Sequence, residues 1–344
     1  MRKTIYVFLS ALIFLIIAEL FFGVVFLLKD ARERLDLQNN TIDFPYLYFS
    51  FKPDDRRIIN QDGLYSKAAR DKDPGIYRII LTGGSVARSY KAPYDKTISY
   101  YLEEELRSRF RTEKIEVINA GMSGYVLEQD FIFIQLVLLY YKPDMIVGLD
   151  GYNDMMSFKL NRYDDFAFAP QNWRDFKVIE CGKASAKWYY RFVGLFKNTA
   201  RVFDFIGKLA TRKSSYDYSA VTDKKLREAR QAYFNILNDI YDFCLSKDVR
   251  YHAFLQPVKW YVPEGPCYVR YGGVPALGGL YREYDTGMRQ CPYGISLTGI
   301  FENNMNVYSD DAHVNNEANI IIAKAMADVL EKEITMHGPR SRGL

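Results

Sequence analysis

This chain repeats a pattern in which short apolar runs alternate with amphipathic helical segments between residues 77 and 154. The apolar runs have the length of strands, and each stops at a turn that contains glycine; they are residues 77–81, 115–118 and 145–149. The segments between them, about 98–110 and 127–141, space their apolar residues as one face of a helix does. Strand and helix repeated in this way predict a parallel sheet covered by helices, which is an α/β fold.

The rest of the chain extends this domain on both sides. A strong amphipathic pattern at about 223–247 predicts a helix, an apolar run at 250–255 predicts a fourth strand, and about 316–331 predicts a last helix. The expected organisation is a lead-in at 29–75 with little regular structure, a domain at 76–335, aromatic and Gly/Pro-rich insertions at about 155–219 and 258–300, and a basic tail at 336–344.

Residues 5–28 are almost wholly apolar, and at the rise of a helix they span about 36 Å, enough to cross a hydrocarbon core of about 30 Å. No small-x-small cleavage site follows cleanly, which favours an uncleaved signal anchor over a cleaved signal peptide. Basic residues lie on both sides of the run, so charge does not settle its orientation. Glu19 lies inside it, and a carboxyl group there is expected to meet a partner helix, stay protonated or turn toward one interface.

Charge and composition exclude several classes of protein. The net charge is only +4 and the basic residues are mixed with acidic ones, so no nucleic-acid partner is expected. The four cysteines have no paired C-x-x-C spacing, which argues against a zinc site. Cys267 and Cys291 bracket a Gly-rich loop, where a disulfide would fit an oxidising compartment and free thiols are the alternative. Without a P-loop lysine or a G-x-G-x-x-G motif, phosphate binding is disfavoured and no cofactor is expected.

The first apolar run leads into Gly83, Gly84 and Ser85. Glycines allow backbone angles that are closed to other residues, and a helix start after them offers free N–H groups. A serine presented there can attack a carbonyl whose oxyanion those amides hold. Such a nucleophile needs a base, and the chain has three histidines.

His313 is the best candidate for the base. His252 lies within an apolar strand, where a core or sheet-face role is the simplest interpretation, and His337 is in the tail. Asp310 precedes His313 by three residues, so a local turn can bring its carboxylate to one nitrogen of the imidazole. Asp311 is a second candidate, ranked lower because neighbouring side chains point apart.

Two later turns offer donors for an oxyanion. Gly124 has no side chain to block its backbone N–H, and Asn153 carries a side-chain amide. Ser123 is a poor alternative to Ser85, because the second glycine of its motif falls one place early for G-x-S-x-G.

These motifs in their order, Gly-Gly-Ser, Asn-x-Gly-x-x-Gly, Gly-x-Asn-Asp and Asp-x-x-His, resemble the four blocks of the SGNH (GDSL-like) hydrolase superfamily over roughly residues 77–330. The resemblance implies a flavodoxin-like three-layer α/β/α fold. It also implies that Ser85 is the nucleophile, that the Ser85 and Gly124 amides with Asn153 form the oxyanion hole, and that Asp310 and His313 complete the triad. Gly84 stands where many members carry aspartate, which alters the turn but leaves the serine.

The expected function is that of a serine esterase, anchored in the membrane, that removes O-acyl groups from a glycan or lipid of the cell envelope. The N-terminal span and the lead-in resemble tethered bacterial members, which implies a domain on the outer face of the inner membrane. An acyltransferase that uses the same acyl-enzyme is one alternative. A catalytically inactive scaffold, held in a membrane complex through Glu19, is another.

Overall fold

A computed structural model describes residue 6 and residues 40–44, 46–160, 223–261, 263 and 275–337. The chain divides into two units, and nearly all of the smaller one, Met1–Thr41 with Trp173–Asp217, lies outside these ranges. The predicted membrane span at 5–28 also lies outside the described residues, apart from Tyr6. So do Cys267 and residues 161–219 of the predicted insertion. None of the helices in the described ranges combines the length and the apolar character that crossing a bilayer requires.

The larger unit contains a sheet of five strands, all parallel to their neighbours. Its strands are β3 (Tyr77–Gly83), β4 (Ile115–Asn119), β5 (Met145–Asp150), β6 (Arg250–Leu255) and β7 (Gly294–Ser296). The spatial order is β4-β3-β5-β6-β7. Of these five strands, the first along the chain, β3, therefore lies between the second, β4, and the third, β5. This is the strand order of flavodoxin-like sheets, and the predicted fold class is confirmed at this level.

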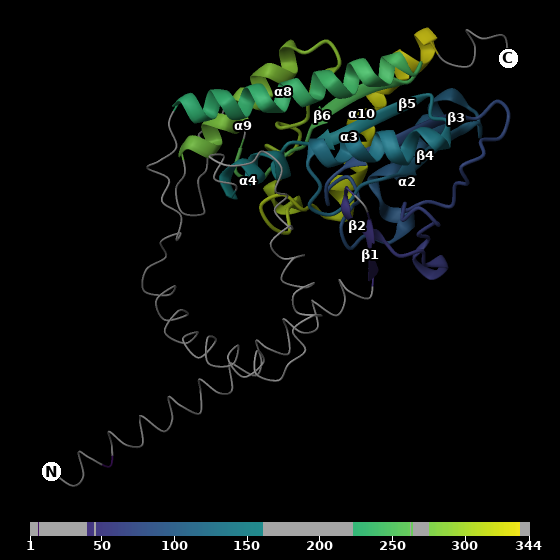
Figure 1. Cartoon of the computed structure of the whole chain (residues 1–344), viewed down its shortest axis with the longest axis horizontal. Coiled ribbons are helices and arrows are strands. Elements are labelled where there is room, and N and C mark those ends of the chain that lie inside the picture. Colours follow the sequence, from purple (N-terminus) through teal and green to yellow (C-terminus); the bar gives the residue numbers. More distant parts are fainter. Residues whose placement is uncertain are drawn as a thin grey trace. The chain divides into compact units, whose positions relative to one another are not determined.

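Helices cover both faces of the sheet, which makes three layers (Figure 1). On one face lie α3 (Leu127–Leu136), α8 (Asp223–Ser246) and α9 (Pro275–Gln290), and on the other lie α2 (Ile98–Phe110) and α10 (Asn316–His337). Strand β3 shows why, because Ile80 packs into the first layer while Ile79 and Leu81 pack into the second. Successive side chains of a strand point to opposite faces, so a strand apolar throughout its length needs cover on both.

Two predicted irregular segments contain regular structure, and those predictions are corrected. The region 258–300, predicted to be a Gly/Pro-rich insertion into the domain, supplies α9 and the fifth strand of the sheet, β7. Helix α9 buries Leu280, Tyr284 and Met288 on one face, although glycines dilute its pattern. The lead-in contains a two-stranded sheet of β1 (Thr41–Phe44) and β2 (Tyr48–Phe51).

Three backbone groups on the outer edge of β4 form hydrogen bonds with residues outside the sheet. Glu103 accepts a hydrogen bond from the Val117 N–H (2.7 Å), and the Arg107 Nε donates to the Ile115 carbonyl (2.8 Å). The lead-in adds a third bond, from the Tyr65 N–H to the Asn119 carbonyl (3.0 Å). Side chains of α2 and one residue of the lead-in thus bind backbone groups at this edge that a further strand would otherwise pair with.

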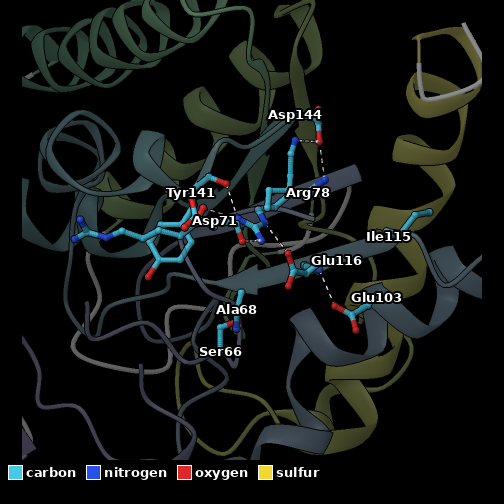
Figure 2. A network of polar contacts seen from close by, with 12 residues as sticks. Ser66, Ala68, Asp71, Arg78, Glu103, Ile115, Glu116, Tyr141 and Asp144 are labelled. Atoms are coloured by element: carbon cyan, nitrogen blue, oxygen red, sulfur yellow. Dashed lines mark hydrogen bonds and ion pairs between the residues drawn. The ribbon is translucent and has the colours of Figure 1, made fainter. Parts of the chain in front are cut away.

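A buried arginine joins the elements at the N-terminal ends of the strands (Figure 2). The side chain of Arg78 is 3% exposed and donates to Glu116 Oε2 (2.5 Å) and to the Tyr141 carbonyl (2.6 Å). Asp144 accepts from the Arg78 backbone N–H (2.7 Å) and from Lys72 Nζ (2.8 Å). This network lies at the N-terminal ends of the strands. The Gly-Gly-Ser turn follows the C-terminal end of β3, so the network stabilises the fold far from that turn.

Candidate active site

The turn after β3 is shaped by close packing at Gly83. This residue has φ of +127°, and a Cβ there would fall 2.4 Å from the Leu149 carbonyl oxygen of β5, so only glycine fits. Ser85 follows in hydrogen-bonded turns, with the Arg88 N–H donating to the Gly84 carbonyl (3.1 Å). The helix start predicted here is absent: these turns run to about residue 91, and helix α2 begins at Ile98.

A second turn, just before α10, holds His313 and Asp310. Asp310 Oδ1 accepts hydrogen bonds from the backbone N–H groups of Ala312 (3.0 Å) and His313 (2.8 Å). Its Oδ2 lies 2.6 Å from His313 Nδ1. Burial alone would raise the pKa of Asp310, but these backbone bonds and the imidazole contact outweigh it and lower the pKa. The carboxylate is therefore charged at neutral pH and fixes the imidazole ring.

The two turns meet at one contact, in which His313 Nε2 lies 2.7 Å from Ser85 Oγ. Because Asp310 takes Nδ1, that nitrogen carries the proton in the neutral ring and Nε2 is left as an acceptor for the serine hydroxyl. The three residues predicted from the sequence thus form a continuous chain of hydrogen-bonding contacts, in which Asp310, not Asp311, contacts the imidazole ring.

His252 has a different environment. Its side chain is buried in β6, its Nε2 lies 3.7 Å from Glu333 Oε2, and burial lowers its pKa. These surroundings agree with the core or sheet-face role that the sequence predicts for His252.

Gly124 and Asn153 both lie near Ser85, Gly124 in a turn and Asn153 as the second residue of the helix that follows β5, α4 (Tyr152–Leu160). The Met122 N–H donates to the Gly83 carbonyl (2.8 Å), which ties the second turn to the first, and Gly124 has φ of +80°. The Asn153 Nδ2 donates to the Tyr125 carbonyl (2.8 Å), and an amide nitrogen has a second hydrogen to offer. A Cβ on Gly84 would fall 2.3 Å from that Nδ2, so the amide lies directly against the residue before Ser85.

Sequence reasoning assigned no role to Asp154, whose side chain links the start of α3 to the residue just before α4. Its Oδ1 accepts from the Leu127 N–H (2.9 Å) and its Oδ2 from the Gly151 N–H (3.0 Å). Burial raises the pKa of Asp154 to about 6, even though these N–H bonds act in the opposite direction. A signal was present, because Asp154 is the third residue of α4 (Tyr152–Leu160), where an acidic side chain often reaches back to cap a helix.

Three more acidic residues interact with Asp154, and the sequence analysis assigned no role to them either. Asp130 of α3 and Asp150 of β5 are buried, and burial raises the pKa of both, followed by the charges of nearby acids. Glu128 has a pKa raised to about 7, again mainly by burial and then by Asp154. Within the described ranges no His, Cys, Asp or Glu side chains are grouped to hold a metal ion. Cys244 and Cys291 are free thiols, and Cys267, the partner that the predicted disulfide needs, lies outside the described residues.

No protein family model and no curated protein sequence matches the chain. Among solved structures, it is similar to EstA, a psychrotrophic esterase from a Pseudoalteromonas species, with 12% identity and a TM-score of 0.42 over 75% of this chain and 98% of that one. A member of the lipolytic protein G-D-S-L family from Veillonella parvula DSM 2008 has 13% identity and a TM-score of 0.37, covering 74% and 97%. The acetyl xylan esterase AlAXEase has 11% identity and a TM-score of 0.40, covering 73% and 98%.

Proposed function

We propose that this chain is a serine esterase with Ser85 as its nucleophile. The observation that carries the proposal is the relay in which Ser85 Oγ lies 2.7 Å from His313 Nε2 and His313 Nδ1 lies 2.6 Å from Asp310 Oδ2. A hydroxyl is a weak nucleophile until a base takes its proton, and a base works best when a third group orients it. The contacts of these three side chains meet both requirements.

In the proposed reaction, Ser85 Oγ attacks the ester carbonyl while its proton passes to His313 Nε2. The tetrahedral intermediate then collapses, its bond to the alcohol breaks, and the imidazolium returns the proton to the leaving oxygen. The acyl group is left on Ser85. The O–H of water or of a sugar then attacks the acyl carbonyl while His313 Nε2 takes its proton, the bond to Ser85 Oγ breaks, and the imidazolium returns the proton to Ser85. Asp310 stays charged throughout and stabilises the imidazolium.

The oxyanion of that intermediate is proposed to bind the Ser85 and Gly124 backbone N–H groups and Asn153 Nδ2. The close approach of the Asn153 amide to Gly84 supports this assignment, because it places the amide nitrogen beside the attacking residue. Such donors are fixed before the reaction starts and cost no reorganisation when charge develops.

The acyl donor is proposed to be an O-acyl group of an envelope glycan or lipid, with residues 5–28 anchoring the chain in a bacterial inner membrane and the catalytic domain on its outer side. The apolar run 5–28 supports the anchor. A partner helix for Glu19 belongs to the same proposal. Water as acceptor would make the protein a hydrolase, and a sugar hydroxyl would make it an acyltransferase.

The main alternative is an inactive scaffold. The hydrogen-bonding distance between Ser85 Oγ and His313 Nε2 favours the catalytic proposal over it, since a scaffold has no need of that contact.

A fluorophosphonate probe tests the proposal directly, because it forms a covalent bond only with an activated serine. We expect labelling of the wild-type chain and of a Ser123→Ala control, and none of Ser85→Ala. Mass spectrometry of the labelled peptide should locate the adduct on Ser85. Persistent labelling of Ser85→Ala, or a folded wild-type chain that stays unlabelled, would refute the assignment. Acyl release from a panel of acetylated glycans and short acyl esters, with and without sugar acceptors, then separates hydrolase from transferase.

A further inference from the structure

The turns that follow Ser85 contain two residues with unfavourable backbone angles, one on each side of Tyr90. Ser89 has φ of 58° and Lys91 has φ of 66°, in the left-handed region that costs side-chain-bearing residues conformational energy. Strain of this kind persists only where the surroundings hold it, and it gathers at functional sites. The turn around Tyr90 therefore calls for an explanation beyond chain reversal.

Contacts on both sides hold this turn in place. The Ser89 hydroxyl accepts a hydrogen bond from the Ile98 N–H (2.8 Å), and the Ala92 carbonyl accepts one from the Tyr65 hydroxyl (3.2 Å). The Tyr90 N–H donates to the Ser85 carbonyl (3.0 Å). The backbone of Tyr90 is thus fixed to the residue that carries the proposed nucleophile.

The side chain that this strained turn presents is an aromatic ring beside the proposed base. The Tyr90 ring centroid lies 5.0 Å from that of His313, with 39° between the planes, and the residue is 48% exposed. Lys91 Nζ lies 4.9 Å from the same centroid. A cation on an exposed ring is held weakly, so the exposed lysine can leave the ring or donate to a ligand that lies there.

The position of Tyr90 indicates which part of a substrate it meets. In the proposed reaction His313 Nε2 gives its proton to the leaving oxygen, so the alcohol part of the ester lies beside His313. A flat aromatic ring with a polar hydroxyl and an ammonium group next to it suits a partner that has both an apolar C–H face and several hydroxyls. A pyranose ring has this combination, whereas a simple aliphatic alcohol lacks it.

We propose that Tyr90 is a binding platform for the sugar ring of a carbohydrate ester, on the leaving-alcohol side of the site. This inference rests on the proposed function and narrows its substrate to an acylated pyranoside. Tyr90 would act mainly on binding, so its loss should raise KM more than it lowers kcat.

Two esters with the same acyl group provide the test: a monoacetylated methyl glucopyranoside and ethyl acetate. In Tyr90→Ala we expect the ratio of kcat/KM for the sugar ester to that for ethyl acetate to fall about tenfold, an effect at the lower end of what alanine substitution costs an aromatic side chain that stacks on a nucleobase. Tyr90→Trp should keep most of the ratio, and Tyr140→Ala, which removes a tyrosine that is 60% exposed at the other end of the sheet, should leave it unchanged. An unchanged ratio in Tyr90→Ala would overturn the platform, including the case where both esters lose activity equally because the ring only supports His313.

Binding without turnover separates failure of the platform from failure of the proposed function. Saturation-transfer NMR of methyl glucopyranoside on Ser85→Ala should show contact with the sugar C–H protons, and Ser85→Ala with Tyr90→Ala should lose it. Equal transfer in both variants would overturn the platform whatever the activity of the wild type. Loss of transfer with Tyr90→Ala, in a chain that the fluorophosphonate does not label, would keep the sugar site and reject the esterase.

Discussion

Gly84→Ala should inactivate the site through a neighbour rather than through the backbone. Gly84 does not have positive φ, so the backbone can accept alanine there, but the new Cβ would fall 2.3 Å from Asn153 Nδ2. Ordinary contact between such atoms begins near 3.4 Å. The amide must therefore retreat by about 1 Å, and because it is the end of a side chain it can do so without unfolding the turn.

The expected loss follows from that displacement. Moving a group by about 1 Å from its productive position costs on the order of 10²-fold in rate, and removing one oxyanion donor costs about 10² to 10³-fold in kcat. We expect Gly84→Ala to lower kcat for nitrophenyl acetate about 10²-fold with little change in KM. The same clash explains why aspartate, common at this position in the superfamily that the motifs resemble, would not fit here without moving Asn153.

A double-mutant cycle tests whether displacement of the Asn153 amide causes the loss. If Gly84→Ala acts only by displacing the amide, then Gly84→Ala combined with Asn153→Ala should be no slower than Asn153→Ala alone. Gly279→Ala in α9 is the matched control, because a Cβ there meets no atom within 4 Å, and it should keep wild-type kcat with a melting temperature no lower than that of the wild type. Wild-type kcat in Gly84→Ala, or losses that multiply in the double variant, would show that the new Cβ does not act by displacing the Asn153 amide.

Three further perturbations test other parts of the molecule. Asp310→Asn should lower kcat by roughly 10² to 10⁴-fold in the same ester assay, because the amide no longer fixes the imidazole tautomer; a loss below tenfold would argue against the relay. The folded pKa of Asp154, about 6, lies above its ordinary value of 3.8, so the folded state binds this proton more tightly than the unfolded state does. The unfolding free energy should therefore rise as pH falls from 7 toward 5, and in urea titrations Asp154→Asn should lose that part of the pH slope; identical slopes would contradict the shift. Arg78→Ala leaves Glu116 and buried carbonyls unpaired and should cost about 3 kcal/mol of unfolding free energy by denaturant titration, while a cost below about 1 kcal/mol would mean that water replaces the guanidinium.

The parts that sequence reasoning predicted well have local signals. Strand β6 and helix α2 follow from apolar period alone, and Ser85 stands out because two glycines end a strand before it. Asp310 and His313 lie three residues apart, so one turn brings their side chains together. This contact could therefore be predicted without knowing how the rest of the chain folds.

The parts that were missed depend on contacts between distant segments. Strand β7 is three residues long and exists because β6 offers an edge to pair with. The need for glycine at position 84 comes from Asn153, and the placement of Tyr90 comes from backbone angles that no sequence pattern announces. The role of Asp154 required knowing that the turns at Leu127 and Gly151 converge.

The occupied edge of β4 also bears on how the protein behaves at high concentration. A free strand edge is a template for pairing with another molecule, and here the bond from the Val117 N–H to Glu103 takes the central donor of that template. Burial raises the pKa of Glu103, so among surface acids this one loses its charge early on acidification and becomes a weaker acceptor. Acidification should therefore weaken the cover of this edge, and Glu103→Gln, which cannot ionise, should weaken it already at neutral pH.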